Sequence, residues 1–352
     1  WTDAPIMPTP GAVGSLIEII AEKESISVVG VDIGGATTDI FSVFQGKFNR
    51  TVSANLGMSY SICNVLAEAG LDNVLRWVPF DIDRKELTNR IGNKMIRPTT
   101  VPQSMEELFI EQAIAREALR LSFIQHKEFA VSLKGIQKER TISDAFDQST
   151  SGETLVNMMD LDLLVGSGGV LSHAPRREQS AKMLIDAFMP QGITQLAVDS
   201  IFMMPQLGVL AAVDKEYLKN EAKTAALEVF NNDCLIRLGT CLNPVGKSKT
   251  GDLLLTAEMK IDRQRIEKIE LYKDDFIKID APYKEINITI TPTKNMDIGA
   301  GRGQELNTVI YGGTVGVIFD GRDRPITIPK ETNERLEALK KWSNAINEYP
   351  EI

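Results

Sequence analysis

Asp32-Ile-Gly-Gly-Ala-Thr-Thr-Asp39 is the stretch that decides the fold, because it connects two β-rich runs. Residues 26–32 before it are β-branched and nearly all apolar, which is typical of a strand covered on both faces. Residues 39–44 and 47–54 after it are also β-rich. The pattern predicts a meander of three strands. Since the segment joins strand to strand, it fits neither a P-loop nor a dinucleotide fingerprint, both of which lead into a helix.

This turn has the composition of a phosphate site. Glycines let backbone amides approach phosphate oxygens without an intervening Cβ, and successive amides form a nest of positive potential. Asp32 and Asp39 end one strand and begin the next, so two carboxylates meet at the base of the turn, and hydrated Mg²⁺ needs only one or two protein oxygens. The residues predicted to contact phosphate are Gly34, Gly35, Ala36, Thr37 and Thr38. The alternative is a tight hairpin whose glycines serve geometry alone.

A second glycine-rich turn follows a short apolar run at residues 161–165. The turn is Gly166-Ser167-Gly168-Gly169, and Pro175 is placed to open a helix that runs towards Phe188. In the order strand, glycine turn, helix, the glycines lack a Cβ, so a ligand bound at the turn can approach the backbone closely.

Composition limits the class of protein. The chain has 352 residues, 43% apolar and 25% charged, which allows two or three globular domains and excludes a disordered or disulfide-rich chain. A net charge of −9 argues against a broad nucleic-acid surface. Three scattered cysteines favour a reducing cytoplasm, and the most apolar run, 201–213, is too short to span a membrane. Because Trp1 is not an initiating Met and no leader pattern follows it, we expect the chain to start inside a longer protein.

The remaining sequence divides into helical and β-rich parts. Helices are predicted over most of 59–126, including one that begins with the capping box Ser104-Met-Glu-Glu107, and residues 129–152 are expected to form a loop. After a helix at 217–230, short strands recur up to a final helix at 331–348. The predicted strands are 234–240, 252–261, 266–272, 276–279, 285–291, 308–310, 315–319 and 325–328. We therefore expect an α/β lobe over 1–215, a β-rich barrel or sandwich over 216–330, and a C-terminal helix over 331–352.

Several strings resemble known families. Residues 32–39 resemble the second phosphate motif of the ATPases that include actin, DnaK-type chaperones and sugar kinases, and Leu163-Leu-Val-Gly-Ser-Gly-Gly169 is similar to their adenosine motif. Over nearly the whole chain, further strings resemble the glutamate mutase accessory family called MutL or GlmL, which is distinct from the mismatch-repair MutL. They are Val31–Asp39, Ile91-Gly-Asn-Lys-Met-Ile-Arg-Pro98, Ala113-Ile-Ala-Arg-Glu-Ala-Leu-Arg120 and Gly312-Gly-Thr-Val-Gly-Val-Ile318.

The resemblance implies an actin-like, ribonuclease H-like ATPase lobe that binds ATP and Mg²⁺. It implies an ATP-dependent chaperone that reactivates an adenosylcobalamin-dependent mutase, with no nucleic-acid or membrane partner. Asp32 would hold a Mg²⁺ water or the attacking water, Thr37 would lie near the terminal phosphate, and Asp39 would support the metal. The residues implied beside ribose and purine are Gly166, Ser167, Gly168 and Gly169. Arg116 lies on the helix that begins at Ser104, where related ATPases place basic residues against the nucleotide.

Two departures from the superfamily pattern stand out. Ala36 replaces a glycine, which is tolerable only at negative φ, and no earlier Asp-x-Gly-x-Thr string supplies the first phosphate motif. Other readings of the chain stay open: a small-molecule kinase or ATP-coupled hydrolase, or an actin-like scaffold. Arg116 could equally belong to a solvated helix face, His173 could cap the next helix, and His126 is expected near the end of its helix. Residues 297–303 form either an anion nest or a glycine-rich connection.

Overall fold

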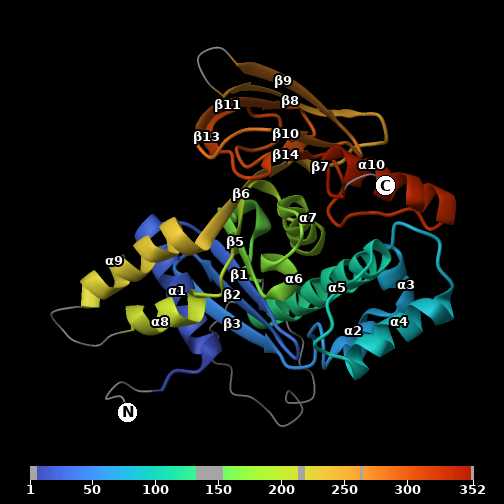
Figure 1. The fold of residues 1–352 in the computed structure, drawn as a ribbon. Helices are drawn as coiled ribbons and strands as arrows, with labels where there is room; N and C mark the ends of the chain where they lie inside the picture. Colours follow the sequence, from blue (N-terminus) through green and yellow to red (C-terminus); the bar gives the residue numbers. More distant parts are fainter. Residues whose placement is uncertain (1–5, 132–153, 213–218, 262–264, 350–352) are drawn as a thin grey trace, which may run out of the picture.

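The computed structural model describes residues 6–131, 154–212, 219–261 and 265–349, and Figure 1 shows their arrangement. Within them, one large mixed β-sheet runs through the molecule. Its strands, in sheet order, are β10 (Phe276–Ile279), β14 (Gly316–Asp320), β6 (Leu235–Asn243), β5 (Gly192–Asp199), β4 (Leu163–Ser167), β1 (Val28–Ile33), β2 (Thr38–Phe44) and β3 (Lys47–Ser53).

The predicted three-stranded meander is confirmed as β1, β2 and β3, which pair antiparallel. Strand β4 lies parallel to β1 on its other side, and β5 lies parallel to β4. A meander followed by two parallel crossover strands beside β1 is the arrangement of a ribonuclease H-like lobe, so the predicted α/β class is confirmed. Every residue of β2 is buried, which explains why the sequence here lacks polar alternation.

Helices cover both faces of this part of the sheet (Figure 1). One apolar core contains Val29 and Val31 with the helices of one face, and a second contains Val28 and Phe41 with those of the other, as alternation along a strand requires. The helices are α1 (Thr9–Glu24), α2 (Ile62–Ala69), α3 (Leu71–Leu75), α4 (Arg84–Ile96), α5 (Met105–Phe129), α6 (Gly169–Ser172), α7 (Arg177–Phe188), α8 (Met204–Ala211), α9 (Lys219–Val229) and α10 (Thr332–Ala345), with a 3₁₀ turn at Met158–Asp160 and a π turn at Phe230–Cys234.

The β-rich part is a sandwich rather than a closed barrel. Its second layer is the four-stranded antiparallel sheet of β13 (Leu306–Tyr311), β11 (Glu285–Pro292), β8 (Leu253–Lys260) and β9 (Ile266–Tyr272), and β12 (Met296–Asp297) pairs with β7 (Val245–Gly246). A third core joins Ile286 and Ile288 of β11 to Leu242 of β6 and Phe319 of β14. The four-stranded sheet therefore packs on the end of the large sheet formed by β6, β14 and β10.

Some predictions differ from the structure. Strand β5 was not predicted, and residues 325–328, predicted as a strand, have no strand pairing. Pro325 lacks the amide hydrogen that a ladder needs, and the preceding Arg324 side chain is bonded to Asp320 and to the Pro190 carbonyl. Most of the predicted loop at 129–152 lies outside the described residues. Strands β6, β14 and β10 continue the sheet of the α/β lobe, and the domain boundary near residue 215 stays a prediction.

None of the helices within the described ranges combines the length and the hydropathy that crossing a bilayer requires.

Candidate functional site

The turn between β1 and β2 is closed by one backbone bond, from the Gly34 amide to the Thr37 carbonyl at 2.8 Å. Asp32 lies opposite Asp39 in the antiparallel register, and the Thr38 hydroxyl is bonded to the Leu56 carbonyl. Ala36 is not among the described residues with positive φ. The alanine that replaces the superfamily glycine is therefore accommodated without backbone strain.

The loop after β3 orients the amides of this turn. The Met58 amide donates to the Gly34 carbonyl at 2.9 Å, and the Ser59 amide donates to the Gly35 carbonyl at 2.8 Å. In a trans peptide the N–H points opposite to the C=O, so the amides of Gly35 and Ala36 point away from this loop.

Within the described ranges, no acceptor binds the amides of Gly35, Ala36 or Thr37. Gly35 and Thr37 are half-buried and Ala36 is exposed, so the three successive amides are open to a ligand, and a row of such amides is an arrangement that can bind an anion.

Both aspartates beside the turn have a raised pKa, so their ionised forms are disfavoured. Burial, together with the smaller effects of the Asp39 and Asp199 carboxylates, raises the pKa of Asp32 to about 6. Burial also raises the pKa of Asp39, against the opposing effect of Arg50 and a hydrogen bond from the Thr37 hydroxyl. Asp39 is 5% exposed, and its Oδ1 has no partner among the described residues.

A divalent cation would relieve both aspartates. No group of three or more His, Cys, Asp or Glu side chains in the described ranges is arranged to hold a metal. Asp32 and Asp39 therefore fit Mg²⁺ that keeps most of its waters, rather than an ion enclosed by protein ligands.

The second glycine turn lies directly beside the first, because Asp32 of β1 pairs with Ser167 of β4. Gly168 has φ +104, and a Cβ there would sit 2.1 Å from the Ile33 carbonyl oxygen. A Cβ at Gly166 would sit 2.9 Å from the side chain of Leu171. Gly168 therefore allows the two turns to approach at backbone distance, and Gly166 allows the second turn to pack against the helices that follow it.

A cavity of about 690 Å³ opens between these turns and the helices of one face. This volume is within the usual range for a small-molecule site. Its lining includes Gly34 and Gly35 of the first turn, Ser59 of the loop after β3, Gly169, His173 and Pro175 in and after the second turn, Lys94 of α4, and Ser104, Glu111 and Gln112 in and just before α5. Of the predicted site residues, Gly34, Gly35 and Gly169 line the cavity. The others, Asp32, Ala36, Thr37, Thr38, Asp39, Gly166, Ser167 and Gly168, lie in or directly beside the two turns.

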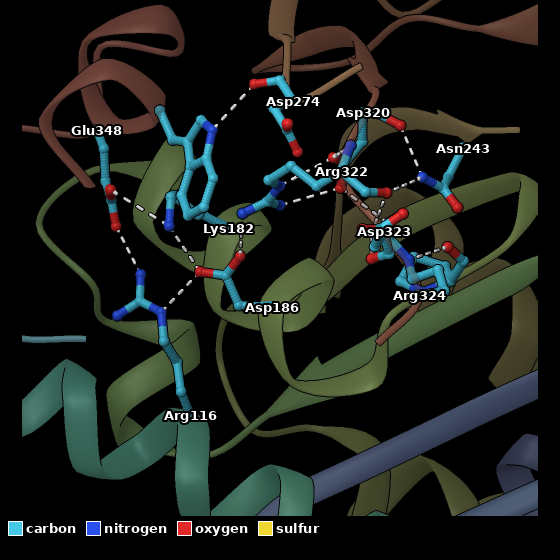
Figure 2. Close-up of polar contacts among 12 residues, drawn as sticks. Arg116, Lys182, Asp186, Asn243, Asp274, Asp320, Arg322, Asp323, Arg324 and Glu348 are labelled. Carbon is cyan, nitrogen blue, oxygen red and sulfur yellow. Dashed lines mark hydrogen bonds and ion pairs between the residues drawn. The ribbon is translucent and has the colours of Figure 1, made fainter. Parts of the chain in front are cut away.

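Arg116 lies elsewhere and does not contact the cavity. Figure 2 shows its guanidinium between two carboxylates, with Nε 2.9 Å from Asp186 and an Nη 2.7 Å from Glu348. The side chain is 4% exposed. Because its donors are used in this buried cluster, the structure does not bring Arg116 to the two turns, which differs from the position that the resemblance implies.

Sequence reasoning missed Lys94 and Glu111, whose side chains line the cavity and pair at 3.3 Å. Burial raises the pKa of Glu111, and Lys94 opposes this shift. One signal was available: Glu111 stands seven residues after Ser104, two helical turns along the same face of α5.

Three lesser candidates are also placed by the structure. His173 is exposed at the cavity edge, against the ring of Phe202. His126 lies in the last turn of α5, as expected, and its ring is buried against β2 and β3, with ring nitrogens 3.0 Å from the Thr51 hydroxyl and 2.7 Å from the Ser42 hydroxyl. Asp297 accepts hydrogen bonds from the amides of Gly299 and Gly301, so these amides are already paired within the segment. This favours the glycine-rich connection over an anion nest at residues 297–303.

Comparison with known proteins agrees with the sequence strings. A sequence model of the family described as MutL protein matches residues 1–225. Protein MutL of Clostridium tetanomorphum is 25% identical over 232 residues, covering 58% of this chain and 47% of that protein. The chain thus spans about half the length of this curated relative.

A solved structure, component A of (R)-2-hydroxyglutaryl-CoA dehydratase from Acidaminococcus fermentans, is 13% identical and covers 60% of this chain and 68% of its own. Its TM-score is 0.28, too low to support an argument. The family match rests on different ground, because it extends over well more than half of the chain. The protein belongs to the MutL family.

Proposed function

We propose that the protein is an ATP-dependent accessory factor that reactivates an adenosylcobalamin-dependent mutase of the glutamate mutase or aminomutase type. The observation that carries the ATP part is the nest of unpaired amides at Gly35, Ala36 and Thr37 beside a 690 Å³ cavity. Membership of the MutL family, together with the resemblance of its strings to the glutamate mutase accessory proteins, supports the mutase as partner.

In this proposal the amides of the nest bind the terminal phosphates of ATP. Asp32 and Asp39 would hold hydrated Mg²⁺, which supplies neutralisation of the phosphate charge. With a pKa of about 6, Asp32 is mostly ionised at neutral pH and can accept a hydrogen bond from a water placed for attack. Gly169, where a Cβ would meet no atom within 4 Å, leaves room for the adenosine part, and the Lys94–Glu111 pair offers both a donor and an acceptor in the same cavity.

The mutase part of the proposal is mechanical. ATP binding and hydrolysis change the conformation around the cavity, and this change opens the mutase so that damaged cofactor leaves. The accessory protein needs no contact with cobalamin for this. Hydrolysis by a positioned water needs no histidine base. His126 lies away from the cavity, and His173 lies at its edge.

Calorimetric titration with ATP, with and without Mg²⁺, tests the site. We expect Mg²⁺-dependent binding that Asp32→Asn weakens by about tenfold or more, corresponding to about 1.4 kcal/mol. Asp280→Asn is the matched control, because Asp280 is exposed in the β-rich part, where its carboxylate pairs with Lys278. Absence of ATP binding by the unaltered protein would refute the proposal.

The partner is tested separately with a mutase inactivated by damaged cobalamin. Corrinoid release, followed by absorbance after gel filtration, should require the accessory protein, ATP and Mg²⁺ together. Release that proceeds equally with ADP, or with Asp32→Asn, would rule out ATP-driven reactivation while leaving nucleotide binding intact.

A further inference from the structure

Three buried side chains from distant parts of the sequence meet beneath the cavity. The Gln112 amide nitrogen on α5 donates to the Gln179 side-chain oxygen on α7 at 3.0 Å, and the Tyr349 hydroxyl donates to the Gln112 side-chain oxygen. Their exposed fractions are 0%, 1% and 7%. We call these residues the Gln–Gln–Tyr cluster. Because buried polar groups are costly when unpaired, each member depends on the others for its position.

This cluster connects two walls of the cavity. Gln112 itself lines the cavity from α5. Gln179 also accepts from the Arg176 amide at 3.4 Å, and Arg176 directly follows Pro175, which lines the cavity from the loop before α7. The side-chain nitrogen of Gln179 donates to the Glu348 carbonyl at 3.1 Å. Residues 348–349 therefore bond to the elements behind both walls.

A charged network fixes the same C-terminal residues in place (Figure 2). Glu348 binds Arg116 at 2.7 Å, and Arg116 binds Asp186 of α7 at 2.9 Å. Asp186 is shared with Lys182 at 2.6 Å and with Arg322 at 2.9 Å. Burial alone would raise the pKa of Asp186, but the three cations hold it well below its ordinary value.

The network extends from Arg322 to Asp320 at the end of β14. Arg322 also stacks over the rings of Phe276 and Trp342, which belong to β10 and α10. The C-terminal segment is thus joined to α5 and α7 by paired charges in fixed geometry, which makes its attachment specific in position.

We propose that Tyr349 and Glu348 are positioning residues of the nucleotide cavity, acting through Gln112 and Gln179, so that attachment of the C-terminal segment and occupation of the cavity favour each other. The proposal rests on the proposed function for the identity of the ligand, and on the contacts above for the coupling. The effect is reciprocal because the two events are thermodynamically linked: if attachment of the C-terminal segment favours ligand binding in the cavity, ligand binding favours that attachment to the same extent.

The test removes one hydroxyl. Tyr349→Phe keeps the ring, which packs edge-on against Phe109 at 4.5 Å, and deletes the hydroxyl, which donates to Gln112 and also interacts with Glu348 and Arg116 of the charged network. Tyr272→Phe is the matched control, because its hydroxyl bonds to Glu270 on an exposed strand of the β-rich part. Hydrogen exchange without nucleotide should rise in peptides of both walls, residues 105–115 and 169–179, for Tyr349→Phe alone. Its dissociation constant for Mg²⁺ and ATP should rise by about fivefold or more.

Two outcomes separate the proposals. If the unaltered protein does not bind ATP, the proposed function fails, and the exchange of the two walls still decides whether Tyr349 positions them. If Tyr349→Phe matches Tyr272→Phe in both wall exchange and ATP affinity, the positioning role is overturned. A loss of ATP affinity with unchanged wall exchange would also overturn it, because the effect would then not pass through the walls. In the supporting outcome, adding ATP lowers exchange in 332–349 of the unaltered protein.

Discussion

A Cβ at Gly168 would lie 2.1 Å from the carbonyl oxygen of Ile33, so the backbones of the two glycine turns are in direct contact. This contact places the predicted phosphate turn and the predicted adenosine turn at one edge of the sheet. Gly168 also has φ +104, which side-chain-bearing residues rarely adopt. The proximity of the two motifs thus depends on a single residue without a side chain.

Gly168→Ala should destabilise the fold by at least about 2 kcal/mol, since both the positive φ and the clash with Ile33 must be relieved. Gly169→Ala is the neighbouring control, because a Cβ there meets no atom within 4 Å and its φ is not positive. Urea unfolding of both variants checks this. Equal stabilities would mean that the two turns are not in contact in solution.

Asp32→Asn should make the free protein more stable at neutral pH while impairing the proposed ATP site. The pKa of Asp32 is raised from 3.8 to about 6, so the folded state holds this proton more tightly than the unfolded chain. The stability linked to Asp32 is complete below about pH 4 and is lost as the pH rises through about 6. The variant should therefore gain about 2 kcal/mol at about pH 7.5, after allowance for solvent screening, and nothing at about pH 4.

The measurement is the free energy of unfolding of both proteins across this pH range. Adding Mg²⁺ and ATP should reverse the order at neutral pH by stabilising the unaltered protein alone. A difference in the free energy of unfolding that does not depend on pH would contradict a raised pKa for Asp32 in the folded protein.

Arg116→Met should cost about 3–5 kcal/mol of stability, because it leaves Asp186 and Glu348 with fewer partners in a buried setting. Arg84→Met, which breaks an exposed pair with Asp72, should change stability little. Chemical denaturation distinguishes them. If Arg116 instead contacted nucleotide directly, the variant would lose ATP affinity without this loss of stability.

His126 should make the protein sensitive to acid. Burial lowers its pKa from 6.5 to about 4, so the folded state holds the ring neutral between the Thr51 and Ser42 hydroxyls. The stability linked to His126 is complete above about pH 6.5 and is lost as the pH falls through about 4. Between about pH 7 and pH 4.5, the unaltered protein should lose about 2 kcal/mol more than His126→Gln. Parallel loss in the two proteins would contradict a buried neutral histidine.

Local patterns were sufficient where a segment's structure depends on its own residues. The meander around residues 32–39, the glycine turn at 166–169 and most β-rich strands were predicted, because β-branched runs and glycine turns carry their conformational preference with them. Strand β5 was missed although it lies in the middle of the sheet. Its segment mixes Thr194 and Gln195 with apolar residues, so the sequence lacks a clear strand pattern. The buried Thr194 hydroxyl donates to the carbonyl of Leu161, 33 residues away, and this partner is known only from the folded structure.

The sequence by itself determined the turn at residues 32–39, its two carboxylates and the glycine turn that lies beside it, since spacing and residue type fix these features locally. Only the tertiary structure decided what Arg116 does and which residues form the far wall of the cavity. Arg116 pairs with Asp186 and Glu348, which lie 70 and 232 residues away in the sequence, and no local pattern predicts such a pairing. A buried charge is placed by the partners that compensate its desolvation, and those partners are known only once the chain is folded.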